Sequence, residues 1–401
     1  MIGPKYKTHF KKPIILAVLA LVIGLVAGWF ILRERSVLPS SKIGGSNQPT
    51  TLTGKPAKIR FIATGDIIAH DSVNINAKSS GSYDYLKLMS NLKPYFDKAD
   101  IRFCNQATPA GGEKFGISGY PIFNAPLQLT RDMVKLGCNV VNLGTNHTND
   151  KGQALIDAVV DEWDKQDILA YAGANRSPID RDSIKYFDVK GVKFAFLSYS
   201  TYTNSPISNG YGVTMYSRNL AKAQLAEANK NAEIVIVSIR WGTEYSPKIN
   251  ESQAVISQDL AYMGADIVLG HGSHVLQPVK KLKGASGNET LVWYSLGNFL
   301  NTQLETEALT GAIGIMDIDI QSKKITNISA LPIYMHYEWT ADEKARGDLL
   351  ARHNIAMYPL DQAAGQIARS QLNTTVEVQT KRITDVLNQY TEVKIIKSSQ
   401  Y

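Results

Sequence analysis

Residues 264–278, GADIVLGHGSHVLQP, contain a strand pattern followed directly by two histidines. The uninterrupted apolar run at 267–269 is typical of a strand that is buried on both faces. The small residues beside His271 and His274 allow the backbone to bend, so both rings can approach one point. Imidazole nitrogen is a common ligand of transition metals. The stretch therefore predicts a strand that ends at a metal site, with a solvated histidine pair as the alternative.

Six other short apolar runs have the same character, and helical patterns separate many of them. Strands that alternate with helices predict an α/β fold in which helices cover a mainly parallel sheet. We expect strands at 59–63, 101–104, 140–143, 194–198, 234–239 and 291–295, and helices at 127–136, 152–165, 220–229 and 252–263.

Polar clusters follow six of the predicted strands. In α/β sheets, ligands bind beyond the carboxyl ends of the strands, where the loops collect polar groups. Because the clusters recur at this position, we predict that they form a single site. They are TGD at 64–66, NQ at 105–106, GTNH at 144–147, RWG at 240–242, GHGSH at 270–274 and LGN at 296–298.

Four residues in or near these clusters have more than one interpretation. Asp66 could ligate a metal or cap the next helix, and capping is favoured when the residue is taken alone. His70, four residues later, is more typical of a surface or structural histidine. Asn146 and His147 put an amide oxygen and an imidazole on one loop, a pair that suits divalent cations. A turn asparagine with a packed histidine is the alternative there.

Arg240 follows a strongly apolar run and has two equally supported interpretations. Its planar guanidinium could clamp a carboxylate or phosphate, or it could pair with Glu244 and brace its own loop. The chain has no G-x-S-x-G elbow, no P-loop and no G-x-G-x-x-G fingerprint. These absences argue against serine hydrolases of that type and against the common nucleotide-binding folds.

Residues 13–32, PIILAVLALVIGLVAGWFIL, form an uncharged apolar stretch. At about 1.5 Å per residue, a helix of this length spans the roughly 30 Å hydrocarbon core of a bilayer. It also exceeds the apolar region of a cleaved signal peptide. We predict a basic cytoplasmic segment at 1–12, an uncleaved single-pass membrane anchor at 13–32 and a flexible linker at 33–57. An extracytoplasmic folded part at 58–338 and a helical C-terminal extension at 339–401 would follow.

The composition is that of a globular protein, with 44% hydrophobic and 20% charged residues in a chain of 401. The formal charge of +7 lies mostly around the predicted anchor, because residues 1–35 carry +5 and leave +2 for the remainder. A positive charge placed beside a membrane segment gives no reason to expect nucleic acid as a partner.

The chain has two cysteines, Cys104 and Cys138, each at or beside an apolar run. We interpret them as two buried free thiols. A disulfide is the alternative in an oxidising compartment, but the sequence cannot position the two sulfur atoms.

The ordered set of strand-end clusters resembles the bacterial capsule-synthesis CapA family, of the poly-γ-glutamate synthesis type. The domain of that family is similar to calcineurin-like metallophosphatases. The resemblance covers about residues 58–300 in family order and includes a membrane anchor. The matching stretches are ATGDII at 63–68, FNAP at 123–126, VNLGTNHT at 141–148, RWGTEY at 240–245, GADIVLGHGSHVLQP at 264–278 and YSLGNF at 294–299.

The resemblance implies a four-layer α-β-β-α sandwich of metallophosphatase type. It places His147 where a general acid, or a group that supports the metal ligands, is expected, and His147 and Arg240 are the predicted catalytic residues. The metal ligands that it implies are Asp66, Asn146, His271 and His274. The predicted contacts to substrate are Asn105, Asn124, Arg240, Glu244 and Asn298.

Two departures from the family pattern reduce the expected number of metal ions. The family usually has Asn-Leu-Glu after the second strand, and this chain has NQA at 105–107 or a close shift of it. Gln106 then stands in place of the glutamate, so a negative charge is missing. Arg240 stands where the family usually has a histidine, and an arginine can neither lose its proton nor ligate a metal. We expect one divalent ion (manganese, iron or zinc) rather than two, and a site without metal is equally conceivable.

The leading functional hypothesis is a membrane-anchored component of capsule or poly-γ-glutamate type polymer synthesis or export. It would bind an anionic envelope polymer at a degenerate metal site, and other membrane subunits of polymer synthesis are possible partners. The alternative is an extracytoplasmic metal-dependent hydrolase that acts on a phosphoester or an amide.

Overall fold

The computed structural model describes residues 57–401. The predicted cytoplasmic segment at 1–12, the anchor at 13–32 and the linker up to residue 56 lie outside the described residues. Within residues 57–401, no helix combines the length and the apolar character needed to cross a bilayer.

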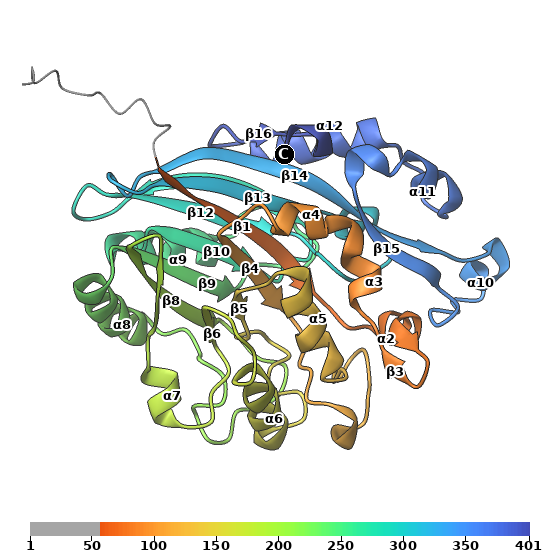
Figure 1. The fold of residues 1–401 in the computed structure, drawn as a ribbon, viewed down its shortest axis with the longest axis horizontal. Helices are drawn as coiled ribbons and strands as arrows, with labels where there is room; N and C mark the ends of the chain where they lie inside the picture. The colour runs from red at the N-terminus through yellow and green to blue at the C-terminus, as the bar shows by residue number, and fades with distance from the viewer. Residues whose placement is uncertain (1–56) are drawn as a thin grey trace, which may run out of the picture. The chain divides into compact units, whose positions relative to one another are not determined.

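Two β-sheets form the centre of the described part (Figure 1). The eight-stranded sheet has the order β15-β14-β13-β1-β4-β5-β6, with β16 paired to β14, and the six-stranded sheet has the order β11-β12-β10-β9-β8-β7. The first sheet contains β1 (Lys58–Ile67), β4 (Ile101–Gln106), β5 (Val140–Asn142), β6 (Ala170–Ala172), β13 (Thr310–Asp319), β14 (Ile325–Glu338), β15 (His353–Pro359) and β16 (Lys394–Ile395). The second contains β7 (Lys185–Val189), β8 (Val192–Ser200), β9 (Ile234–Arg240), β10 (Ile267–His271), β11 (Leu276–Lys283) and β12 (Glu289–Leu296). A separate hairpin joins β2 (Lys78–Ser79) to β3 (Ser82–Tyr83).

The six-stranded sheet has a parallel centre between antiparallel edges, whereas the eight-stranded sheet is parallel towards β6 and antiparallel towards β15. The strands β1, β4, β5 and β6 are parallel neighbours, and so are β8, β9, β10 and β12. Antiparallel pairing adds β13, β14 and β15 to the first sheet, and β7 and β11 to the second. Every apolar run predicted as a strand coincides with one, although β5 ends at Asn142, one residue before the predicted end at 143, so the expected α/β fold is confirmed.

Helices cover the outer faces of the two sheets, which gives a mixed α/β sandwich (Figure 1). One apolar core contains residues from both sheets, and a second lies between the six-stranded sheet and its helices α8 and α9. The helix α9 begins at a capping box, in which the side chains of Asn250 and Gln253 each bond the backbone of the other. The helices are α2 (Asp71–Ala77), α3 (Leu86–Met89), α4 (Lys93–Phe96), α5 (Gln128–Leu136), α6 (Gln153–Trp163), α7 (Pro178–Asp182), α8 (Arg218–Asn231), α9 (Glu251–Tyr262), α10 (Ala341–Ala345), α11 (Ala364–Arg369) and α12 (Val376–Leu387).

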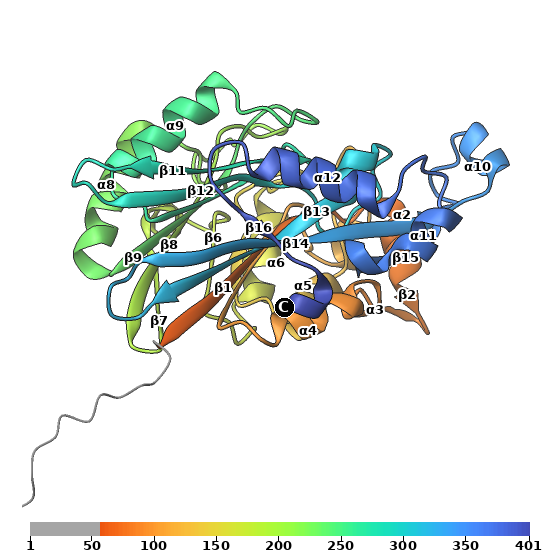
Figure 2. The same ribbon diagram turned by 90° about the horizontal axis from the view of Figure 1, so that it is seen from above.

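The segment after residue 338 differs from the expected helical extension. It contains α10, α11 and α12, but it also contributes β15 and β16, which both pair with β14. Figure 2 shows this segment lying across β14 and along β11. The expectation is corrected because β15 alternates buried and partly buried residues from Ile355 onward, which is a strand pattern.

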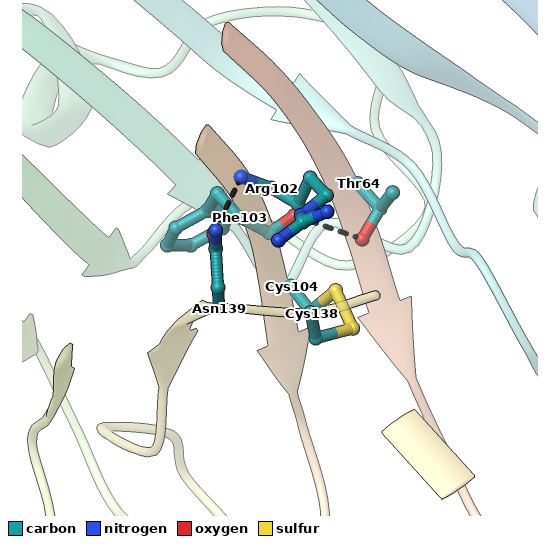
Figure 3. Close-up of a disulfide and its surroundings, with 6 residues drawn as sticks. All are labelled: Thr64, Arg102, Phe103, Cys104, Cys138 and Asn139. Carbon is teal, nitrogen blue, oxygen red and sulfur yellow. Dashed lines mark hydrogen bonds between the residues drawn. A yellow bond between two sulfur atoms is a disulfide. The ribbon is translucent and has the colours of Figure 1, made fainter. Parts of the chain in front are cut away.

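The two cysteines form a disulfide, so the interpretation as free thiols is wrong (Figure 3). Cys104 lies on β4 and Cys138 precedes β5, and their Cα atoms are 5.8 Å apart. Both side chains are buried. The parallel pairing of β4 with β5 brings the two together although 34 positions separate them in sequence. Strand pairing is a tertiary feature, so the sequence alone could not decide between a disulfide and two free thiols.

Candidate functional site

A pocket of about 950 Å³ lies at the carboxyl ends of strands from both sheets. Strand register explains how distant residues meet there. Asp66 on β1 is opposite Asn105 on β4, and His271 on β10 is opposite Arg240 on β9. Of the predicted site residues, the pocket is lined by Asp66, Asn105, Asn146, His147, Arg240, Glu244, His271 and His274.

Asp66 is the centre of a buried polar network. Its Oδ1 accepts a hydrogen bond from the Asn105 amide at 2.5 Å, and Asn142 in turn donates to the Asn105 oxygen at 2.7 Å. His274 Nδ1 lies 2.8 Å from the other carboxylate oxygen. Burial raises the pKa of Asp66, but His274 and the nearby His271 and Arg240 outweigh it and hold the pKa below its usual value. Asp66 is therefore a carboxylate, and it does not cap α2, which begins at Asp71.

His271 is buried beside this carboxylate with neither ring nitrogen hydrogen-bonded to any residue within 57–401. Its ring stacks on Phe103 with centroids 5.4 Å apart, and its Nδ1 is 3.8 Å from Asp66 Oδ1. Burial lowers the pKa of His271 to about 4, although Asp66 opposes this shift. The imidazole is thus neutral at pH 7 and presents an unshared nitrogen lone pair, which is the form that binds a metal.

Arg240 is buried on the pocket floor and is held by several groups. Its Nε donates to Asn146 Oδ1 at 2.8 Å, and one terminal nitrogen donates to Glu244 at 2.8 Å. The guanidinium also lies over the Tyr202 ring, 4.3 Å from the ring centre. A Cβ on Gly272 would come within 2.4 Å of the Arg240 side chain, so only glycine leaves room for it. Of the two interpretations of Arg240, the structure thus contains the pairing with Glu244 that braces the loop.

The donor set fits one metal ion better than two. The Asn146 oxygen already accepts a hydrogen bond from Arg240, so an ion bound to its remaining lone pair would face the fixed charge of Arg240. Asp66 and His271 present buried atoms without hydrogen-bond partners, and His274 lies beside them. Residues 57–401 nevertheless contain no cluster of three or more His, Cys, Asp or Glu side chains already spaced for a metal. Because Asp66 and His274 touch each other, an ion would have to enter between them.

Gln106 does not face this site. The prediction that a glutamine at this position removes a negative charge from the metal pocket is therefore corrected. Its oxygen accepts a hydrogen bond from the Trp163 indole at 2.9 Å, and its amide donates to the Thr108 carbonyl at 3.1 Å. Successive residues of a strand point to opposite faces, so Asn105 faces the pocket and Gln106 faces the helix layer. Ala107 lines the pocket at this edge.

His147 is oriented by Asp150, a residue that the sequence analysis missed. The Asp150 carboxylate lies 2.8 Å from His147 Nδ1 and also accepts the Phe123 backbone N–H at 2.7 Å. With Nδ1 held in this way, Nε2 is the other nitrogen for proton transfer, and the Asn204 amide nitrogen lies 3.3 Å from it. The histidine and the aspartate are three positions apart after the strand, a spacing that could have indicated the pair.

Two predicted substrate contacts lie outside the pocket wall. Asn124 is buried, and its side chain bonds the backbone of Gly111, Gly112 and Gly116, so it shapes a loop. Asn298 is also buried, and its oxygen is 3.1 Å from His274 Nδ1. The predicted role of direct substrate contact is corrected for both, because their polar atoms are already used by the protein.

The sequence analysis also missed Arg352, which comes from the segment before β15 and lines the pocket. A lone arginine in a polar loop gives no sequence signal of this kind. It reaches the pocket only because β15 pairs with β14 and brings its preceding loop to the mouth of the site.

His70 lies in the pocket wall as a structural histidine, in agreement with the favoured interpretation. Its Nδ1 accepts the Thr302 backbone N–H at 3.2 Å, and its ring meets Phe123 edge-on. Burial and the nearby Arg352 charge lower the pKa of His70 from 6.5 to about 3. The folded protein therefore keeps this imidazole neutral.

Replacing His70 by glutamine is expected to weaken the acid sensitivity of the fold. Below about pH 6.5 the unfolded chain protonates His70 whereas the folded chain does not. The free energy of unfolding therefore falls as the pH drops from about 6.5 towards 3. Urea unfolding at neutral and acidic pH should show a smaller fall in His70→Gln than in the wild type. The exposed His353, changed to glutamine, is the control, and an identical fall in all three proteins would contradict the assignment.

The fold and the site define a mixed α/β sandwich protein with a histidine, aspartate and arginine pocket at its strand ends. The profile of the family described as "Bacterial capsule synthesis protein PGA_cap" matches residues 60–303. The chain therefore belongs to this family of bacterial capsule synthesis proteins.

Two relatives from Bacillus are similar in sequence. The PGA biosynthesis protein CapA of Bacillus subtilis (strain 168) is 32% identical over 195 residues, 47% of this chain and 50% of the relative. The match thus spans half the length of that protein. The capsule biosynthesis protein CapA of Bacillus anthracis is 27% identical over 323 residues, 77% of this chain and 73% of the relative. Among solved structures, a phosphatase from Mycoplasma pneumoniae aligns with a TM-score of 0.46 and 14% identity, covering 70% of this chain and 95% of that one.

Proposed function

We propose that this protein is a membrane-anchored, extracytoplasmic component of capsule or poly-γ-glutamate type polymer synthesis or export. Its pocket binds an acidic group of the polymer at a degenerate metal site. Family membership supports the polymer system, and the two similar Bacillus proteins carry capsule and PGA biosynthesis names. Other membrane subunits of the polymer system are its expected partners.

The single observation that carries the proposal is the place of Arg240. Its guanidinium packs on Gly272 and donates to the oxygen of Asn146, so a fixed positive charge stands beside a predicted ligand and disfavours a second metal ion. A fixed positive charge at that point attracts an anion and cannot release it by losing a proton. Recognition of an acidic group is therefore favoured over two-metal hydrolysis.

One divalent ion, manganese, iron or zinc, fits the proposal. Asp66, His271 and His274 would hold it, and when bound it would add positive charge that attracts the acidic group. Asn105 fixes the Asp66 carboxylate, and Asn298 fixes the His274 ring. The protein residues thus orient the donors whether or not an ion is present.

A metal-dependent hydrolase is the second candidate, and the His147–Asp150 pair is the observation that favours it. Asp150 fixes the His147 ring through Nδ1, and Nε2 would donate a proton to a leaving group that displaces the Asn204 amide, now 3.3 Å away. The substrate would be a phosphoester or an amide. This candidate needs chemistry as well as binding, and the two are separable by experiment.

The membrane placement belongs to the same proposal. The apolar stretch at 13–32 supports a single-pass anchor with a cytoplasmic N-terminus. The disulfide between Cys104 and Cys138 supports an oxidising compartment for the folded part. Finding both cysteines as free thiols in protein taken directly from its host cells would contradict this placement.

Titration of the purified full-length chain with poly-γ-glutamate, with and without Mn²⁺, tests the function. We expect the wild type to bind the polymer. In Arg240→Met the affinity should be lower by about tenfold or more, because a charge-assisted contact contributes about 1.5–3 kcal/mol. We also expect at most one ion per chain by elemental analysis. His271→Ala should lower the metal content, whereas the exposed His353→Ala should not. Phosphoester hydrolysis that needs Mn²⁺ and disappears in His271→Ala would instead establish the hydrolase.

A further inference from the structure

Arg352 is a buried arginine at the mouth of the pocket, and its charge has no carboxylate partner. Only 5% of the residue is exposed, yet it lines the pocket. Within residues 57–401, no Asp or Glu oxygen lies within ion-pair distance of its guanidinium, whereas Arg240 on the pocket floor is paired with Glu244. Arg352 is thus the pocket cation whose charge the protein leaves uncompensated.

The guanidinium of Arg352 is nevertheless held firmly in place. Its Nε donates to the Leu349 carbonyl at 2.7 Å and its Nη1 donates to the Thr302 carbonyl. The group lies over two aromatic rings, with its central carbon 5.3 Å from the Tyr337 centroid and 6.0 Å from the Trp339 centroid. Within residues 57–401, the remaining nitrogen, Nη2, makes no hydrogen bond of ordinary geometry, although the Tyr337 side chain lies close enough to raise the pKa of Arg352. The arrangement fixes the plane of the guanidinium and leaves one edge available to a ligand.

A buried unpaired charge destabilises the folded state, so it calls for a compensating partner. Burial lowers the pKa of Arg352, and Tyr337 only partly opposes this shift. The neighbouring His70 stays neutral, and an imidazole does not supply a negative charge in any case. The partner that is missing from the protein must therefore be an anion that enters the pocket.

We propose that Arg352 forms the anion-binding subsite of this pocket and accepts an acidic group of the ligand through its free guanidinium edge. This rests on the proposed function and deepens it, because it assigns recognition of the acidic group to a residue outside the metal donors. The shared chemistry is that of carboxylate or phosphate oxygens, both of which match the planar donor edge of arginine. Arg240, whose charge is partly compensated by Glu244, then supports the same acidic group from the floor of the site.

The test compares full-length wild type with Arg352→Met and with Arg346→Met, an exposed arginine of the same segment. Two probes are titrated by calorimetry, a γ-linked glutamate oligomer and inorganic phosphate, at low and moderate salt. We expect Arg352→Met to weaken binding of the effective probe about tenfold or more and to reduce its salt dependence. Arg346→Met should leave both unchanged.

The outcomes separate this inference from the proposed function. Equal binding of the glutamate oligomer by wild type and Arg352→Met overturns the inference and leaves the polymer function standing. Binding of phosphate alone, lost in Arg352→Met, supports the subsite and overturns the polymer function. Should Arg352→Met fail to fold, Arg352→Lys replaces it, since it retains the charge but loses the planar edge. Unimpaired binding by Arg352→Lys would also overturn the inference.

Discussion

Replacing Cys104 and Cys138 together by alanine is expected to lower the free energy of unfolding by about 3–4 kcal/mol. The disulfide closes a loop of 34 positions, and a cross-link of this span restricts the unfolded chain by roughly that amount. The bond also joins β4, which carries Asn105, to the approach of β5, which carries Asn142. Urea unfolding of the oxidised wild type and of the double variant measures the difference.

Reduction provides the internal control for this prediction. Wild-type protein treated with a reductant should lose about the same stability as the double variant, and the variant should not respond to the reductant. Because Asn105 bonds Asp66, polymer binding should weaken in the same preparations. A loss below about 1 kcal/mol would show that the bond contributes little to the fold.

Gly272→Ala is expected to destabilise the protein by about 3–5 kcal/mol and to abolish binding at the pocket. Gly272 has a φ of +94°, which an alanine adopts only with strain. The added Cβ would also lie within 2.4 Å of three Arg240 atoms. To relieve that overlap, Arg240 would have to leave Asn146 and Glu244, and a buried charge would lose its partners.

Gly287→Ala is the matched control for Gly272→Ala. Gly287 has a similar φ of +82°, but a Cβ there meets no atom within 4 Å. Its substitution should therefore show the backbone strain alone, about 1–2 kcal/mol. In an Arg240→Ala background, the loss of unfolding free energy caused by Gly272→Ala should fall to that smaller value. A double-mutant cycle measures this change. Equal losses for both glycine variants in the wild-type background would contradict the close packing of Arg240 on Gly272.

The elements that could be predicted are those with a strong local pattern. The buried parallel strands are continuous apolar runs, so β1, β4, β9 and β10 are recognisable from residue type alone. The edge strand β15 mixes buried and exposed positions and was not recognised. Its dependence on β14 for pairing is a property of the sheet, so no local window of sequence contains it.

The candidate site shows the same division. Asp66, His147, Arg240, His271 and His274 were predicted because each follows a recognisable strand, and parallel strand ends meet at one edge. Gln106 was assigned to the wrong face, although strand alternation places it opposite to Asn105. That error arose from a family comparison in which the alignment could shift by one residue.

By itself, the sequence determined the class of fold, the family and the strand ends at which the chemistry lies, because these follow from local apolar patterns and short motifs. Tertiary structure alone decided the disulfide between Cys104 and Cys138, the packing of Arg240 on Gly272 and the entry of Arg352 into the pocket. Each of these depends on which strands pair and in which register. That choice is made by the burial of the whole core, and no single segment encodes it.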